Sequence, residues 1–141
     1  MNKQQLAVKN YLMGAMWIDQ DINCKLGQIQ VLSDLATRAT STISDVPGSP
    51  NRNIHKMEDV IVKMVDLQAQ IGEDIDKLLV LKENIMGCIR QVENRDGRVV
   101  LEARYLRQLK WEDIAFDLGF SMRQVFRIHD ESLEKITIPE S

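Results

Sequence analysis

Three side chains near the C-terminus, Arg123, Gln124 and Arg127, have the chemistry and spacing that base recognition requires. Arginine can pair bidentately with guanine, and glutamine with adenine, in the major groove. Two apolar neighbours, Met122 and Phe126, suit contact with thymine methyl groups. If one helix presents these five residues outward, we expect them to contact DNA bases.

A second set of side chains suits the phosphate backbone rather than the bases. A serine at the start of a helix lies beside unpaired backbone N–H groups, which bind anions. Basic side chains that precede such a helix can anchor phosphates by charge. We therefore expect phosphate contacts from Arg104, Arg107, Lys110 and Ser121. The alternative is a merely solvated arginine face, which we disfavour because a helix-turn-helix pattern surrounds these residues.

The residues around Gly119 have the spacing of a helix-turn-helix. Gly119 permits the positive φ that a tight turn between helices needs, and Ser121 with Gln124 predicts a capping box. The residues that would let two helices cross closely are Ala115, Gly119, Val125 and Ile128. The pattern predicts three short helices at about residues 98–106, 111–118 and 121–136, with a core that includes Ile114, Leu118, Phe120 and Leu133.

Two long helices are expected to precede these short ones. Apolar residues recur every three or four positions over residues 5–44 and again over residues 55–93, whereas residues 44–51 hold two prolines and a glycine and predict a loop. A helix of about 39 residues extends roughly 58 Å, so each long helix needs an equally long partner. We therefore predict an all-α fold, in which a long antiparallel helical hairpin, coiled-coil-like, is followed by a small three-helix helix-turn-helix domain.

The domain boundary is expected where residues 94–97 interrupt the second long helix. Gly97 suits the left-handed position just past a helix end. The predicted domains are residues 1–95, a hairpin for oligomerisation or partner binding, and residues 96–141, which bind DNA. Pairing the long helices about the loop centre places Cys24 near residue 73 and Cys88 near residue 9. No intrachain disulfide is therefore expected.

Apolar residues beside the predicted seam indicate a second contact face on the hairpin. They are Val31, Val62, Val65, Leu79 and Val80. We interpret them as an interface with another copy, which predicts a homodimer or higher oligomer through the long helices. The alternative is that the C-terminal domain folds back over these positions.

Composition limits the remaining classes of function. The net charge is −3, so DNA binding must depend on local basic residues; residues 98–129 hold six Arg or Lys against four acids. No apolar run is long enough for a membrane span and no signal peptide is evident, so we expect a cytoplasmic protein without a membrane partner. Because His55 and His129 lie on different elements and no phosphate loop or metal-ligand cluster occurs, we expect neither an enzyme nor a cofactor.

Residues 101–129 carry a resemblance to a known family. The strings Arg-Tyr-Leu at 104–106, Trp-Glu-Asp-Ile-Ala at 111–115, Leu-Gly-Phe-Ser at 118–121 and Arg-Gln-Val-Phe-Arg-Ile-His at 123–129 resemble sigma factor region four. They are more similar still to phage-encoded, sigma-like regulators of the RinA/ArpU-like type, from Gram-positive bacteria and their prophages. The resemblance implies a transcription regulator that controls phage late, packaging or export genes.

The sequence departs from that family in two respects. Such motifs often have Ser or Thr capping the helix that begins at Trp111, whereas this chain has Lys110 there. The chain also lacks the promoter-melting domain of sigma factors, so we do not expect it to open promoters alone. Two alternatives stay open: a small terminase-like DNA-packaging protein, which would form a large ring, and an adaptor that binds RNA polymerase without reading bases.

Overall fold

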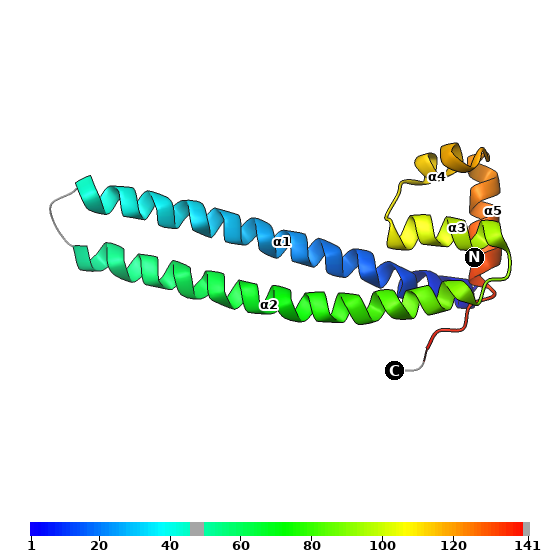
Figure 1. The fold of residues 1–141 in the computed structure, drawn as a ribbon, viewed down its shortest axis with the longest axis horizontal. Coiled ribbons are helices and arrows are strands. Elements are labelled where there is room, and N and C mark those ends of the chain that lie inside the picture. Colours follow the sequence, from blue (N-terminus) through cyan, green and yellow to red (C-terminus); the bar gives the residue numbers. More distant parts are fainter. Residues whose placement is uncertain (46–49, 140–141) are drawn as a thin grey trace. The chain divides into compact units, whose positions relative to one another are not determined.

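The structure, a computed structural model, describes residues 1–45 and 50–139, and describes side chains outside residues 39–54. Its elements are, in chain order, α1 (Lys3–Asp45), α2 (Pro50–Arg90), α3 (Arg95–Leu101), the π-helical segment η1 (Glu102–Leu106), α4 (Trp111–Leu118) and α5 (Met122–Leu133) (Figure 1). The described residues contain no strand, and the predicted all-α class is confirmed.

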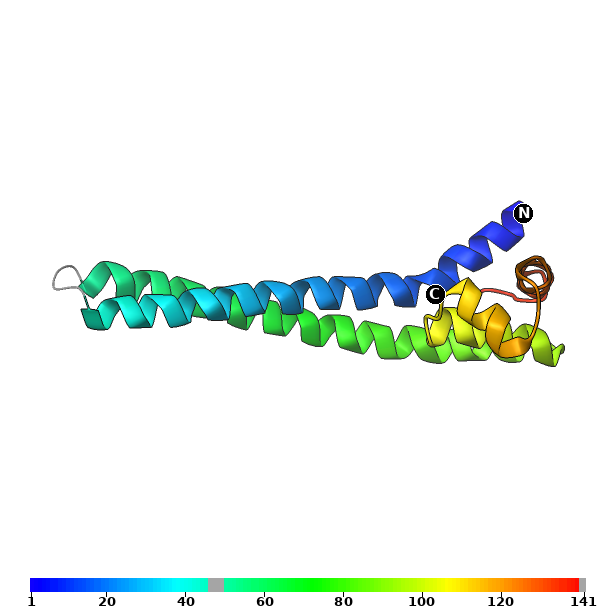
Figure 2. The same ribbon diagram turned by 90° about the horizontal axis from the view of Figure 1, so that it is seen from above.

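The chain divides into two compact units. The hairpin unit is Asp19–Lys77, and the terminal unit combines Met1–Ile18 with Leu78–Ser141. Within the hairpin unit, α1 and α2 run side by side in opposite directions (Figures 1 and 2). An ion pair joins Lys25 Nζ to Asp74 Oδ2. This contact confirms the register predicted from the loop centre, which placed position 24 near position 73.

The terminal unit contains the ends of both long helices as well as the short helices. Its buried apolar residues from the long helices include Val8, Leu12, Ala15, Leu78, Ile85, Cys88 and Ile89. At the start of α1, the side chains of Asn2 and Gln5 each accept a hydrogen bond from the other's backbone N–H at 2.8 Å, a reciprocal capping box. Gln5 Nε2 also donates to the backbone carbonyl of Asp130 on α5 at 2.9 Å. The compact units therefore divide elsewhere than at the predicted boundary after residue 95.

The segment that joins α2 to α3 differs from the prediction. Asn94 caps α3, because its side chain accepts a hydrogen bond from the N–H of Asp96 at 2.9 Å. Gly97 lies inside α3 and not in a left-handed position, so that prediction was wrong. A Cβ at this position would collide with Ser132 Oγ and lie 3.0 Å from Val92 Cγ1. Glycine is needed here because the backbone of α3 approaches α5 closely.

The ends of the helices correct several predicted bounds. Positions 44, 45, 50 and 51 belong to helices rather than to the predicted loop, whose centre at 46–49 lies outside the described residues. Pro50 fits the first helical position, where its missing N–H leaves no bond unmade. The helix predicted over 98–106 is α3 followed by η1, and α5 ends at Leu133 rather than at residue 136.

The residues predicted to form a second face of the hairpin are each exposed, in the hairpin unit as well as in the terminal unit. Its five members have exposed fractions between 56% and 59%: Val31, Val62, Val65, Leu79 and Val80. Both cysteines are free, as predicted; Cys24 is exposed and Cys88 is buried. Among the described residues, no helix has the length and apolar character needed to cross a bilayer.

Candidate nucleic-acid interface

The turn between α4 and α5 has the predicted geometry. Gly119 ends α4 with φ 69° and ψ 29°, a left-handed conformation that costs glycine little. The N–H of Phe120 then donates to the carbonyl of Ala115 at 3.0 Å. Because no atom lies within 4 Å of a Cβ built on Gly119, the backbone angle alone explains the need for glycine.

The helices α4 and α5 cross through the residues that the sequence indicated, of which Ala115 is the small one. Ala115 is 6% exposed, Val125 is fully buried and Ile128 is 7% exposed. They share one core cluster, which consists of Val100, Ala103, Ile114, Ala115, Val125 and Ile128. The packing of α4 on α5 therefore follows the predicted helix-turn-helix pattern, with α3 and η1 supplying the third wall.

Ser121 begins α5 as predicted. Its extended backbone precedes the helix, and its Oγ accepts a hydrogen bond from the N–H of Gln124 at 3.1 Å, which is the forward half of the capping box. Lys110 precedes α4 in an extended conformation without a side-chain cap, as its residue type implied. The start of α5 is thus the better-defined helix end of the two.

Four of the predicted contact residues line one hollow at the start of α5: Ser121, Arg123, Gln124 and Arg127. Arg123 and Arg127 are exposed, and Gln124 is half-buried. Residues four apart lie on the same face of a helix, so both guanidinium groups can reach the same surface. The structure therefore brings together the polar base-contact residues and the helix-capping hydroxyl.

The two apolar members of the predicted set lie at the margin of this hollow. Met122 is half-buried and packs against the core cluster. Phe126 is 40% exposed, and the centre of its ring lies 5.1 Å from that of Trp111 in an edge-to-face arrangement. Phe126 thus keeps an accessible edge for a base methyl group, whereas Met122 mainly supports the helix.

The basic residues before α4 separate into two kinds. Arg107 and Lys110 are exposed, as phosphate contacts require. Arg104 instead donates from Nη1 to the carbonyl of Leu109 at 3.0 Å, and its Cζ lies 4.7 Å from the centre of the Trp111 ring. These contacts fasten the start of α4 and favour a structural role for Arg104 over phosphate binding.

A buried polar pair, Tyr105 on η1 and His129 on α5, was not predicted. Tyr105 Oη lies 2.6 Å from His129 Nε2, and His129 Nδ1 lies 2.9 Å from Asp130 Oδ1. Burial lowers the pKa of His129, although the hydrogen bond and charge of Asp130 oppose that shift; burial also raises the pKa of Tyr105 well above 10. The pair fits a neutral imidazole that accepts from the phenol and donates to the carboxylate. Its sequence signal was two polar residues at inward-facing helical positions.

Opposite charges dominate the outer face of α4 and the first half of α5. The exposed residues of α4 include Glu112, Asp113 and Asp117, whereas the exposed part of α5 that follows Ser121 carries Arg123 and Arg127. Carboxylates repel phosphate, so the outer face of α4 does not suit a nucleic-acid backbone. The electrostatically suitable surface is the first half of α5 together with Arg107 and Lys110.

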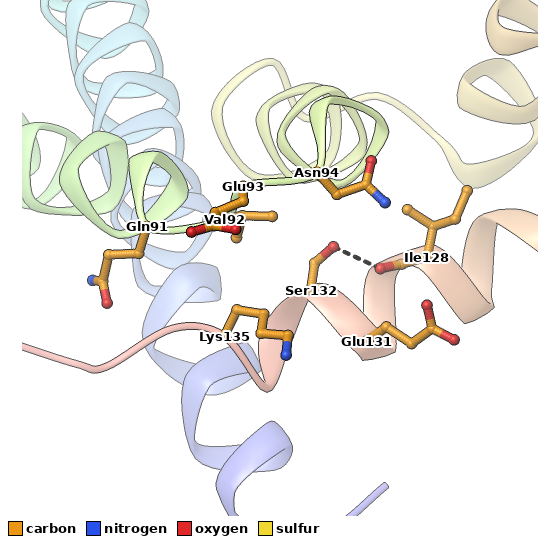
Figure 3. Close-up of a pocket in the computed structure, with 8 residues that line it drawn as sticks. All are labelled: Gln91, Val92, Glu93, Asn94, Ile128, Glu131, Ser132 and Lys135. Atoms are coloured by element: carbon orange, nitrogen blue, oxygen red, sulfur yellow. Dashed lines mark hydrogen bonds between the residues drawn. The ribbon is translucent and has the colours of Figure 1, made fainter.

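A second pocket, of about 640 Å³, lies beside the C-terminal half of α5 (Figure 3). Its wall includes Asn94, Glu131 and Lys135, and the Ser132 hydroxyl donates to the carbonyl of Ile128 at 2.7 Å. Acidic and basic side chains both line it, which gives no preference for a polyanion. Among the described residues, no cluster of three potential metal ligands occurs.

Comparisons with known proteins place the chain in a family. No curated protein and no solved structure matches it. One family model, described as "Protein of unknown function (DUF1492)", matches residues 30–137 and so covers most of the chain, including all of α3, α4 and α5. On this match, the chain belongs to the DUF1492 family.

Proposed function

We propose that this protein is a sequence-specific DNA-binding transcription regulator that reads the major groove with α5. The observation that carries the proposal is the hollow at the start of α5, where Ser121, Arg123, Gln124 and Arg127 converge. A helix-turn-helix presents the N-terminal residues of its second helix to base edges, and these residue types are the ones that pair with guanine, adenine and phosphate.

The packing around α5 supports this use of the helix. A rigid scaffold must hold base-reading side chains in register, and α5 is fixed by buried Val125, Ile128 and Leu133. Arg123 and Arg127 are exposed on the same helix, so they can leave water for a ligand without disturbing the core. The acidic surface of α4 restricts phosphate contact to Ser121, Arg107 and Lys110.

The test is selection of bound sequences from random duplex DNA, followed by affinity measurements over a salt series. We expect Arg123→Ala and Arg127→Ala each to weaken specific binding by about 1–3 kcal/mol and to relax the preference at one base position. Lys110→Ala is expected to weaken binding to all sequences and to reduce the salt slope by about one. Lys56→Ala, which removes an exposed charge from the hairpin unit, is the control.

Two outcomes would replace the proposal. Loss of polymerase association with unchanged DNA binding in the Arg123→Ala/Arg127→Ala variant would indicate an adaptor that does not read bases. A ring of about eight or more chains that packages DNA would indicate a small terminase-like role. The resemblance to RinA/ArpU-like phage regulators favours regulation of phage or prophage genes over both, and a regulator of bacterial DNA works in the cytoplasm.

We also propose that the long helices form a homodimer through the exposed apolar face of the hairpin. Val62 and Val65, one turn apart on α2, are more than half exposed, and isolated two-helix seams bury little surface. Val62→Glu/Val65→Glu should shift the sedimentation mass from dimer to monomer. Gln70→Glu, at an exposed polar position of the same helix, should leave the mass unchanged. A wild-type monomer at all concentrations would contradict the dimer.

A further inference from the structure

The outer face of α4 carries an exposed phenylalanine in an acidic setting. Phe116 is 86% exposed, more than any other large apolar side chain described. Glu112 and Asp113 lie one turn earlier on the same face, Asp117 follows directly, and all three are exposed. We call Phe116 with these three carboxylates the acidic knob. Because a single exposed apolar side chain is common on protein surfaces, Phe116 becomes informative only beside a surface that complements it.

A groove elsewhere on the terminal unit has the opposite chemistry. It lies between the end of α2 and the segment formed by α3 and η1, and its volume is about 400 Å³. Its apolar lining includes Met86, Val99 and Leu106, and its basic residues are Arg90, Arg95 and Arg98. Glu102 also lines the groove, so its charge is three positive against one negative. We call it the basic groove.

The arginines of the basic groove are positioned by the helix junction. Arg98 Nη1 donates to the carbonyls of Val92 and Glu93 at 2.8 and 2.7 Å, which fixes its guanidinium beside the end of α2. Arg90 and Arg95 are exposed and can turn toward an incoming carboxylate. Charge-assisted pairs between arginine and carboxylate are among the stronger hydrogen bonds, particularly when an apolar contact excludes water beside them.

We propose that the acidic knob of one copy docks into the basic groove of a second copy. The phenyl ring of Phe116 would lie on Met86, Val99 and Leu106, and its flanking carboxylates would meet Arg90 and Arg95. The two surfaces have opposite charge, each has an apolar part, and both belong to the terminal unit. The knob does not suit DNA, because three carboxylates would face the phosphates.

The contact joins different patches on the two copies, so it is heterologous. A heterologous contact generates a ring if the rotation closes and an open array if it does not. The surface involved is small and bears charge, so we expect weak association that declines as salt increases. The contact leaves the Arg123–Arg127 hollow of α5 outside the named surfaces, and it stands whether or not α5 reads DNA.

The test uses one variant for each surface in the full chain. Phe116→Ser removes the knob, and Arg90→Glu/Arg95→Glu reverses the groove. Each should raise the dissociation constant of self-association by about tenfold or more, measured by sedimentation equilibrium from micromolar to millimolar chain. Mixing the two variants should recover association between unlike chains, because the knob of one and the groove of the other stay intact.

Controls separate this contact from association through the hairpin. Every pairing of variants has the same hairpin unit, so the difference between like and unlike pairs reports the knob and groove alone. Lys56→Glu, a charge reversal in the hairpin unit, should not change the dissociation constant. Because Phe116, Arg90 and Arg95 are exposed, circular dichroism should show unchanged folding. Self-association that neither variant weakens, or unlike pairs that bind no better than like pairs, would overturn the proposal.

Discussion

The terminal unit and the hairpin unit hold together by different means, although α1 and α2 contribute to both. Of the 19 buried apolar residues among the described side chains, 18 belong to the terminal unit, and the hairpin unit has one, Ile71. Hydrophobic burial is the main stabilising contribution to folding. The terminal unit therefore has the core of an independent domain, whereas the hairpin unit depends on a narrow seam.

Buried polar groups show the same contrast. Gln5, His129 and Ser132 are the buried polar residues described, and all three belong to the terminal unit. Each has a hydrogen-bond partner: Asp130 for Gln5, Tyr105 for His129 and the Ile128 carbonyl for Ser132. No buried side-chain N or O atom described lacks one. Satisfied networks of this kind specify one arrangement of helices, as the proposed reading of bases would require.

The largest effect should come from a cavity in the terminal unit. Leu12 is fully buried, so Leu12→Ala should reduce the free energy of unfolding by about 2–5 kcal/mol. The matched change Leu26→Ala, at a half-exposed position of α1 in the hairpin unit, should change it by less than about 0.5 kcal/mol.

Chemical denaturation followed by two probes measures this difference. Both tryptophans, Trp17 and Trp111, belong to the terminal unit, so fluorescence reports that unit while circular dichroism reports all helices. Leu12→Ala should shift the fluorescence transition strongly. An equally large shift for Leu26→Ala would contradict the contrast between the two units. It would show that another surface buries Leu26 in the hairpin unit.

Two glycine-to-alanine substitutions should change the stability by intermediate amounts, with opposite signs in the two units. Gly97→Ala should destabilise the protein by about 1–3 kcal/mol, because the new methyl group would collide with Ser132 and displace α3 from α5. Gly72→Ala should stabilise it by about 0.5–1 kcal/mol, since nothing lies within 4 Å and alanine favours helix. Thermal unfolding of both variants decides the matter, and destabilisation by both would refute the assignment of Gly72 to an open helix face.

Patterns local to the sequence predicted much of the fold and part of the site. Helical periodicity predicted both long helices, and the position of the loop predicted the register that Lys25 and Asp74 confirm. The type of residue 119 predicted the left-handed turn, and the order Ser121 to Gln124 predicted the cap. The turn and the cap depend on residues within a few positions of one another, whereas the register follows from the lengths of two helices about one loop.

Features that depend on contacts between distant residues were missed or predicted incorrectly. Gly97 resembles a helix terminator in sequence, but its role is set by Ser132, which lies 35 positions later. The residue type of Arg104 suits a phosphate ligand, and it does not disclose the contacts that the guanidinium makes with the Leu109 carbonyl and the Trp111 ring. The packing of Gln5 against α5 is equally non-local, so the extent of the terminal unit could not be read from helix boundaries alone.

The smallest effect should be a pH dependence that is confined to the terminal unit. Burial lowers the pKa of His129 in the folded protein below its ordinary value of 6.5, with Asp130, Lys9 and Arg104 as its charged neighbours. The unfolded chain therefore binds a proton more readily, so the stability contributed by neutral His129 is complete above pH 6.5 and declines as the pH falls below it.

His129→Gln keeps a polar group beside Tyr105 but cannot take up this proton. The stability lost between about pH 7.5 and about pH 5.5 should be greater in the wild type than in the variant, by tryptophan fluorescence in denaturant. Equal losses of stability in the two proteins would mean that the folded protein holds the imidazolium of His129 as well as the unfolded chain does. The buried Tyr105–His129 pair would then not distinguish the terminal unit from the hairpin unit.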